Sequence, residues 1–431
     1  MAEASDRQPI PLLLRWQGLF RSTAPTLSRL EWLAGGVQML LLASLPFVTR
    51  GGLALEIAAA GLLWILWSLV TPPKPIHPIS GWLLLIVAVA GVSTGFSPVP
   101  VAAAKGLLKL LSYLGVYALM RRLIETNPHW WDRQLAALLT GGLISSVLAL
   151  RQLYASTEEL ARWADPNSIT AGTIRIYGPL GNPNLLAGYL LPLLPLAVIA
   201  VLQWRGLGSK LFAAVTALLS GVAILLTYSR GGWLGLLASL AVMVLLLILR
   251  STASWPPLWR RLVPLLALSL GGVLLAVAVT QVEPIRTRVA SLLAGRGDSS
   301  NNFRINVWLA AIDMVQDRPW LGIGPGNTAF NSIYPLYQQP KFNALSAYSV
   351  PLEILVEMGI PGLLACGGLL IASVKSGLRL HGPRGLIAIG SLAAISGLMI
   401  QGITDTIFFR PEVQLTGWFC LAGLAGIRQS N

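Results

Sequence analysis

A succession of long apolar runs is the feature that most constrains the fold of this chain. A helix needs about 20 apolar residues to cross the hydrocarbon core of a bilayer. Twelve runs approach this length: residues 32–48, 53–70, 79–94, 101–120, 135–154, 184–203, 211–228, 232–249, 262–282, 350–374, 385–404 and 414–427. Of the 431 residues, 55% are hydrophobic and 11% charged, which excludes an ordinary soluble protein. We therefore predict one all-α, polytopic integral membrane domain over residues 1–431, with about 12 transmembrane helices.

The basic residues predict how these helices are oriented. The formal net charge is +14, but the basic residues are spread over alternate loops instead of forming one nucleic-acid-binding stretch. If the N-terminus is cytoplasmic, the cytoplasmic loops carry groups such as Arg121, Arg122 and Arg133, whereas the opposite loop at 94–100 carries no charge. Short cytoplasmic loops of membrane proteins are enriched in Lys and Arg. The pattern predicts that the N- and C-termini are both cytoplasmic and that nucleic acid is not a partner.

Residues 283–349 form the longest hydrophilic stretch and are predicted to be a large extracytoplasmic loop between helices 9 and 10. Within this loop, apolar residues recur at helical spacing and predict an amphipathic helix. These residues are Ile305, Trp308, Leu309, Ile312 and Val315. Asn301 or Asn302 could cap the start of the helix, and Arg318 before Pro319 should end it, because proline disfavours a helical conformation in the preceding residue. Function is expected in this loop, since a membrane domain has little structural need for it.

Arginines on the extracytoplasmic side are the first candidates for a binding site. Guanidinium groups bind phosphate and carboxylate oxygens well in partly dry sites. Arg230 separates two apolar runs at a very tight turn, Arg304 begins the amphipathic helix, and Arg175 and Arg318 lie in extracytoplasmic loops. The alternative is that these side chains only extend to the membrane interface and contact lipid headgroups.

Two lysines inside a predicted span are further candidates for anion binding. Lys105 and Lys109 lie one helical turn apart in the run 101–120, where a charge is costly. They could line the path of an anionic ligand. Equally, Lys105 could form a structural ion pair with Glu56, which lies at a similar predicted depth.

Histidine is unavailable for chemistry on the extracytoplasmic side. All three histidines, His77, His129 and His381, fall in predicted cytoplasmic loops. A general base there would have to be a carboxylate or a tyrosine. The candidates are Glu353, Asp313, Asp317, Asp405 and Tyr348. We single out Tyr348 and Glu353 as possible catalytic residues, and we predict neither a metal nor a cofactor, because no cluster of metal ligands is present.

Several motifs resemble those of the O-antigen ligase superfamily. They are Tyr177-Gly-Pro-Leu-Gly-Asn-Pro-Asn184 with its continuation to residue 189, and the segments 228–235, 303–308, 318–327 and 352–363. The resemblance covers nearly the whole chain. More specifically, the run from 298–304 through 345–353 is similar to a cyanobacterial branch described as inorganic-carbon (bicarbonate) transporters, IctB.

The superfamily resemblance implies a GT-C-like fold and a site on the outer leaflet. Its ligases transfer a glycan from a polyprenyl-pyrophosphate carrier to lipid A core without a metal, and arginines hold the pyrophosphate. Arg230 and Arg304 occupy the matching motif positions here. The ligases also carry a His-Asn pair before the next span, which falls on Tyr348 and Ser349 in this chain. The histidine is thus replaced, and enzymatic activity stays an open question.

Three functions follow as alternatives. The branch resemblance favours bicarbonate uptake in the plasma membrane of a cyanobacterium, through an outward-facing arginine-rich site that binds the small anion. The superfamily resemblance favours a glycan ligase or polymerase whose partner is a polyprenyl-pyrophosphate-linked glycan. The third alternative is a non-catalytic binding or assembly protein. All three require contact with membrane lipid.

Overall fold

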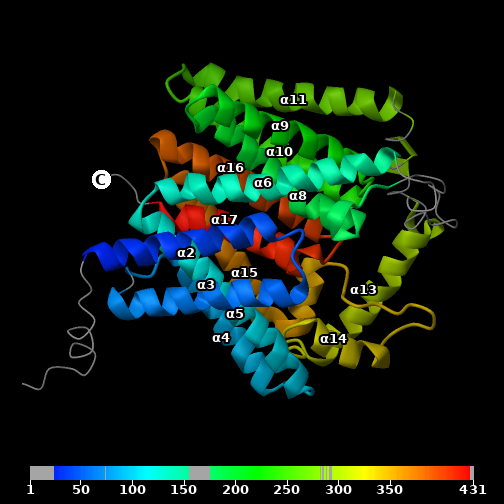
Figure 1. Cartoon of the computed structure of the whole chain (residues 1–431). Helices are drawn as coiled ribbons and strands as arrows, with labels where there is room; N and C mark the ends of the chain where they lie inside the picture. Colours follow the sequence, from blue (N-terminus) through cyan, green and yellow to red (C-terminus); the bar gives the residue numbers. More distant parts are fainter. Residues whose placement is uncertain are drawn as a thin grey trace, which may run out of the picture.

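The computed structural model describes residues 24–427 except 73, 155–174, 282, 284–285, 288 and 291–293, and it contains helices and no strand in these residues. Most of the long helices run along one bundle direction (Figure 1). They are α2 (Ala24–Ser44), α3 (Arg50–Val70), α4 (Pro78–Gly95), α5 (Pro100–Thr126), α6 (His129–Arg151), α8 (Pro183–Gln203), α9 (Leu207–Leu226), α10 (Arg230–Ser251), α11 (Pro257–Gln281), α15 (Val350–Leu378), α16 (Gly382–Gly402) and α17 (Pro411–Gly426). This all-helical architecture is consistent with a polytopic membrane protein.

Ten helices of the described residues are long and apolar enough to cross a membrane, which is fewer than the twelve predicted. The runs at 32–48 and 414–427 are helical but are not among the ten. Helix α17 has only 16 residues, and every residue from Val413 to Gly426 is buried within the protein. Helix α2 carries Arg29 and Glu31 in its first half. The apolar character of α17 therefore reflects the protein core rather than exposure to lipid.

The core lies where α8, α16 and α17 pack together. Sixteen of the 21 residues of α8 are buried, whereas α11 is largely exposed and lies at one edge of the bundle (Figure 1). Small residues let the central helices approach closely. A side chain on Gly397 of α16 would overlap Leu191 of α8 and come within 2.8 Å of the carbonyl oxygen of Gly235 on α10. Without a hydrophobic driving force between helices in lipid, such close packing is a main source of association.

The segment between α11 and α15 lies at one end of the bundle. We call this end, at which α5, α8, α10, α15 and α17 begin, the loop end. This segment contains α13 (Ser299–Asp317) and α14 (Asn327–Ile333), with a 3-10 turn before α13 (Gly295–Gly297) and another after α14 (Tyr334–Leu336). Further 3-10 turns at the loop end are Gln152–Tyr154, Gly178–Leu180 and Ile407–Phe409. Figure 1 shows α13 and α14 together at the lower right of the bundle.

Helix α13 confirms the predicted helix but corrects its cap and its buried face. The cap is Asp298, one turn earlier than expected, because its carboxylate accepts the amide N–H of Asn301 at 3.1 Å. The helix ends at Asp317, before Arg318 and Pro319, as predicted. The buried face consists of Asn306, Val307, Ala310, Ala311 and Met314. Leu309 and Ile312, which were expected in it, are exposed, because the small alanines instead bring this helix close to its neighbours.

A break in α15 fixes this segment to the bundle. Gly359 has φ 64° and ψ −166°, which interrupts the helix and leaves nearby backbone groups without helical partners. Residues 319–324 supply these partners. The amides of Ile323 and Gly324 donate to the carbonyls of Val356 (2.8 Å) and Glu357 (2.9 Å), and the Ile360 amide donates to the Pro319 carbonyl (2.8 Å). Irregular backbone of this kind is tolerated within a membrane only where protein buries it.

The following turn packs directly against α5, which provides a test of this arrangement. A Cβ on Gly106 would overlap the carbonyl oxygen of Pro325, and Gly106 also contacts Gly326. Gly106→Ala is therefore expected to lower the free energy of unfolding by about 1–3 kcal/mol through overpacking. Thermal unfolding of the purified protein in detergent measures this. Gly91→Ala on α4 is the control, since a Cβ there meets nothing within 4 Å; equal melting temperatures for the two variants would contradict the packing described.

Candidate functional site

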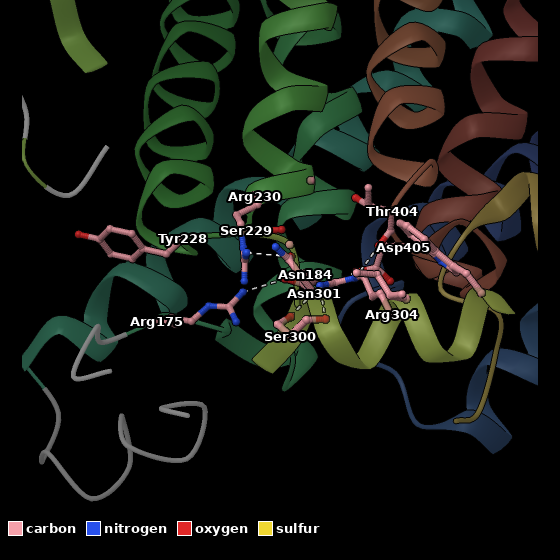
Figure 2. Close-up of a pocket in the computed structure, with 14 residues that line it drawn as sticks. Arg175, Asn184, Tyr228, Ser229, Arg230, Ser300, Asn301, Arg304, Thr404 and Asp405 are labelled. Atoms are coloured by element: carbon pink, nitrogen blue, oxygen red, sulfur yellow. Dashed lines mark hydrogen bonds between the residues drawn. The ribbon is translucent and has the colours of Figure 1, made fainter. Parts of the chain in front are cut away.

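Three helices begin around one polar pocket at the loop end. They are α8, α10 and α13, and the pocket has a volume of about 250 Å³ (Figure 2). We call it the arginine pocket. Its polar lining includes Arg175, Asn184, Arg230, Ser300, Arg304 and Asp405. Helix N-termini carry unpaired backbone N–H groups and a partial positive charge, so three of them together favour an anion.

Arg230 enters the pocket from the first residue of α10, where the chain turns sharply from α9. Tyr228 has φ 48°, and the Ser229 hydroxyl accepts the Gly232 amide at 3.2 Å to cap α10. Arg230 forms a 2.8 Å salt bridge with Asp298, whose side chain is fully buried, and donates to the Asn301 side chain at 3.0 Å. The salt bridge therefore joins the N-terminus of α10 to that of α13.

Arg175 approaches from the segment before α8. Its Nε donates to the Thr227 carbonyl at 2.8 Å, and its Nη2 donates to the side-chain oxygen of Asn184 at 2.8 Å. The Asn184 amide nitrogen donates in turn to a carboxylate oxygen of Asp405 at 2.9 Å. Figure 2 shows Arg175, Arg230 and Arg304 in one cluster, with the Tyr228 ring pointing away from it. Polar contacts thus connect α8, the α9–α10 turn and the segment after α16.

Arg304 lies on the second turn of α13 and reaches the segment after α16. Its Nε donates to the Thr404 carbonyl at 2.9 Å, and its Nη1 donates to the Ser300 hydroxyl at 2.7 Å. Burial lowers the pKa of Arg304 and raises the pKa of Asp405, and each group's charge opposes the shift of the other. An arginine stays protonated in proteins, so the pocket keeps its positive charge. The carboxyl of Asp405 is the group whose protonation can change.

A second, larger cavity of about 960 Å³ adjoins the arginine pocket, and Asp405 lines both. We call it the large cavity. Its polar lining includes Lys105, Lys109, Asn182, Tyr348, Asp405 and Arg410. Tyr348 has φ 50°, a conformation that costs a non-glycine residue about 1–2 kcal/mol. Its ring packs edge-on against the Phe303 ring, with the two ring centres 5.4 Å apart. Its backbone carbonyl accepts a hydrogen bond from Trp308 Nε1 at 3.4 Å. Burial raises the pKa of Tyr348, with Asp405 adding to the shift and Arg304 opposing it.

The two lysines of α5 lie in the large cavity and not in the predicted ion pair. Lys109 donates to the Phe409 carbonyl at 2.8 Å and lies 5.5 Å from the centre of the Tyr113 ring. Glu56 accepts a hydrogen bond from the Ser44 hydroxyl at 2.8 Å and forms no salt bridge with Lys105. Of the two alternatives given for Lys105, the ion pair with Glu56 is therefore not the one that the structure contains.

Two predicted site residues lie outside both cavities. Arg318 donates to the Phe96 carbonyl at 3.0 Å and so joins the end of α13 to the segment between α4 and α5. Glu353 is 1% exposed, and its carboxylate accepts the Ala347 amide hydrogen. This contact holds the segment before α15 in place, so Glu353 supports the position of Tyr348 without facing either cavity.

Sequence reasoning did not single out three residues that organise the site. Asp298 was missed because its charge pairs with an arginine 68 positions away. Asn184 lies within a motif noted above, but nothing local indicated its contacts with Arg175 and Asp405. Asp405 was one of several carboxylates on the same side, and only the fold places it between two cavities. The described residues contain no group of three or more metal-binding side chains.

Removing the Asp298 charge tests its pairing with Arg230. Asp298→Asn keeps a residue that caps helices well but leaves Arg230 without its buried counter-ion. We expect the free energy of unfolding to fall by about 3 kcal/mol. Thermal or denaturant unfolding in detergent measures it. Asp313→Asn, at an exposed position on the same helix, is the control; similar stability of the two variants would show that the pair contributes little.

Residues 215–367 match the family model described as O-antigen ligase, and this segment is about a third of the chain. A search of curated proteins finds no match. The matched segment contains Arg230, Arg304 and Tyr348 and the part of α15 that is broken at Gly359. Over this segment, the chain is similar to O-antigen ligases.

Proposed function

We propose that this protein is a glycan ligase or polymerase that binds a polyprenyl-pyrophosphate-linked glycan in the arginine pocket. The observation that carries the proposal is the convergence of three helix N-termini and three arginines on one pocket of about 250 Å³. The similarity of residues 215–367 to O-antigen ligases supports it. We also propose that the fold is GT-C-like, that both termini are cytoplasmic and that the site faces the outer leaflet.

The charges of the arginine pocket suit an anion with several oxygens. Among the described residues, Arg175, Arg230 and Arg304 lie around the carboxylates Asp298 and Asp405, so that this part of the pocket carries more positive than negative side chains. Helix N-termini add backbone N–H donors, which bind phosphate groups in many proteins. Guanidinium groups can bind two phosphate oxygens at once. A pyrophosphate linked to a lipid presents enough oxygens to use donors from all three helices.

The large cavity is proposed to hold the acceptor. A volume of about 960 Å³ lies at the upper end of ordinary ligand pockets and can admit sugar units. Asp405 lies between the two cavities and accepts hydrogen bonds from Asn184 and from its neighbour Thr406. A pyrophosphate-linked sugar on one side and an acceptor hydroxyl on the other would meet at this residue.

Asp405 is the proposed general base. The acceptor oxygen attacks the anomeric carbon of the donor sugar, and the bond from that carbon to the pyrophosphate oxygen breaks. The lipid pyrophosphate leaves with the electron pair and is stabilised by the arginines, while the hydroxyl proton passes to the Asp405 carboxylate. Tyr348 suits this task less well, because burial raises its pKa and keeps it neutral. The substitution of tyrosine for the ligase histidine is therefore compatible with transfer.

Bicarbonate uptake, together with the cyanobacterial branch and its plasma membrane, stays a prediction. A single small anion with three oxygens would need only part of the arginine pocket and none of the large cavity. The described helices also supply no feature that favours a transport cycle over transfer. The pyrophosphate proposal accounts for both cavities, and the bicarbonate prediction does not.

Binding of the carrier is tested with two matched arginines. Arg304→Gln removes a donor from the arginine pocket, and Arg318→Gln removes an arginine at the opposite end of α13, outside the pocket. We expect Arg304→Gln to weaken binding of polyprenyl pyrophosphate about 10- to 100-fold and Arg318→Gln to leave it nearly unchanged. Titration of the purified protein followed by native mass spectrometry measures both. Displacement of the carrier by millimolar bicarbonate, or equal effects of the two substitutions, would contradict the proposal.

The pH dependence of transfer tests the role of Asp405. A base acts when deprotonated, and burial raises the pKa of Asp405, so activity should rise with pH through a value above that of an ordinary aspartate. Asp405→Asn should lower the transfer rate about 100-fold or more and remove this rise, whereas Tyr348→Phe should change the rate only a few-fold. Glycan transfer from a purified lipid-linked donor gives the profile. Loss of activity in Tyr348→Phe with an active Asp405→Asn would reverse the assignment.

A further inference from the structure

We propose that a cavity between α3, α4 and α5, at the end of the bundle opposite the loop end, binds one anionic phospholipid. The cavity has a volume of about 680 Å³ and is far more apolar than the arginine pocket; we call it the α3–α5 cavity. Figure 1 shows its three helices together at the lower left of the bundle. The proposal does not rest on glycan transfer: no residue of the arginine pocket lines this cavity, although three residues of the large cavity do.

The apolar wall of the α3–α5 cavity is suited to acyl chains. Leu62 and Ile65 on α3, Leu84 on α4 and Leu111 on α5 line it, and all four are exposed on the protein surface. These helices are among the ten candidate membrane spans. Gly61 and Gly115 also line the cavity, and α3 and α5 are in contact there, since a Cβ on Gly115 would lie 3.4 Å from the Gly61 Cα. Hydrocarbon of the surrounding bilayer can therefore enter this cavity.

A basic cluster lines the polar end of the same cavity. Lys74, Arg121 and Arg122 gather there with one carboxylate, Glu125, so that the cluster has an excess of positive charge. These groups are held in place by the protein. Arg121 forms a 2.7 Å salt bridge with Glu125 and donates to the Ser80 hydroxyl at 2.9 Å. Lys74 donates to the Glu125 carbonyl at 2.7 Å.

Arg122 is also held in place by contacts with the protein, so that the cations of the cluster have fixed positions. Its Nη2 donates to the Thr71 carbonyl at 2.7 Å, and its guanidinium lies 4.8 Å from the centre of the Trp67 ring. An apolar chamber with fixed cations at one end matches an amphipathic molecule with an anionic head. Basic pockets between transmembrane helices bind anionic lipid headgroups in this manner.

The position of the cations decides between two possible lipids. The α3–α5 cavity shares Ile57, Ala58 and Ser112 with the large cavity, so the chain of a lipid with its head at the loop end could extend into it. However, the basic cluster lies at the far ends of α3 and α5, beyond the reach of such a head. A phospholipid from the leaflet at that end would place its phosphate on the cluster and its chains along the apolar wall.

Filling the cavity is the first test. Gly61→Leu adds a side chain inside the cavity, where a Cβ meets nothing within 4 Å, so the fold should tolerate it. Gly91→Leu places the same side chain at an equally open position of α4 outside the cavity. Native mass spectrometry after incubation with phosphatidylglycerol should show one retained lipid for the native protein and Gly91→Leu, and none for Gly61→Leu. Equal retention by Gly61→Leu would overturn the site.

The headgroup contact is tested separately. Lys74→Gln should weaken phosphatidylglycerol binding about fivefold, as expected for one cation near a lipid phosphate, whereas Lys210→Gln on α9 at the same end should not. Native protein should retain phosphatidylglycerol in preference to phosphatidylcholine. Equal retention of the two lipids would refute the role of the basic cluster. Blocking of polyprenyl pyrophosphate binding by Gly61→Leu would assign the cavity to the substrate chain and overturn the phospholipid proposal.

Discussion

The backbone pairing at the break in α15 is the interaction on which the loop end depends. Gly359 interrupts the helix. Backbone groups of residues 319–324 then form the hydrogen bonds that residues 356–360 cannot form within the helix. The Ser93 hydroxyl lies within hydrogen-bond distance of carbonyls on both sides of this contact, those of Leu321 and Glu357, to either of which it can donate, and so attaches the contact to α4. Because the end of α13 is anchored here, its beginning is brought to the start of α10. The arginine pocket thus depends on a contact that contains none of its own residues.

The arginines of the pocket are held by protein acceptors in the described structure. Arg230 pairs with Asp298, and Arg304 and Arg175 donate to backbone carbonyls as well as to side chains. Such partners satisfy buried donors and fix the guanidinium groups in position. A bound anion would then gain from groups already oriented, without the entropic cost of ordering long side chains. The Asp405 carboxylate is the acidic counterpart that both cavities share.

Two regions of the membrane domain combine apolar volume with fixed positive charge, and they lie at opposite ends of α5. Lys105 and Lys109 face the large cavity at the loop end, whereas Arg121 and Arg122 lie at the other end beside the α3–α5 cavity. Charges are costly within a bilayer unless they contact polar groups, water or headgroups. Placing them near the two ends of one helix lets each pair reach a different interface.

Features that depend on neighbouring residues could be predicted from the sequence alone. Apolar length predicted membrane helices, and Pro319 ended α13 where expected. Which charges meet depends instead on the packing of distant segments. Asp298 lies against Arg230 across 68 positions, Asp405 lines both cavities, and Arg318 lies outside the arginine pocket. Helix formation follows local patterns, whereas the pairing of buried charges depends on how distant helices pack, which no local pattern specifies.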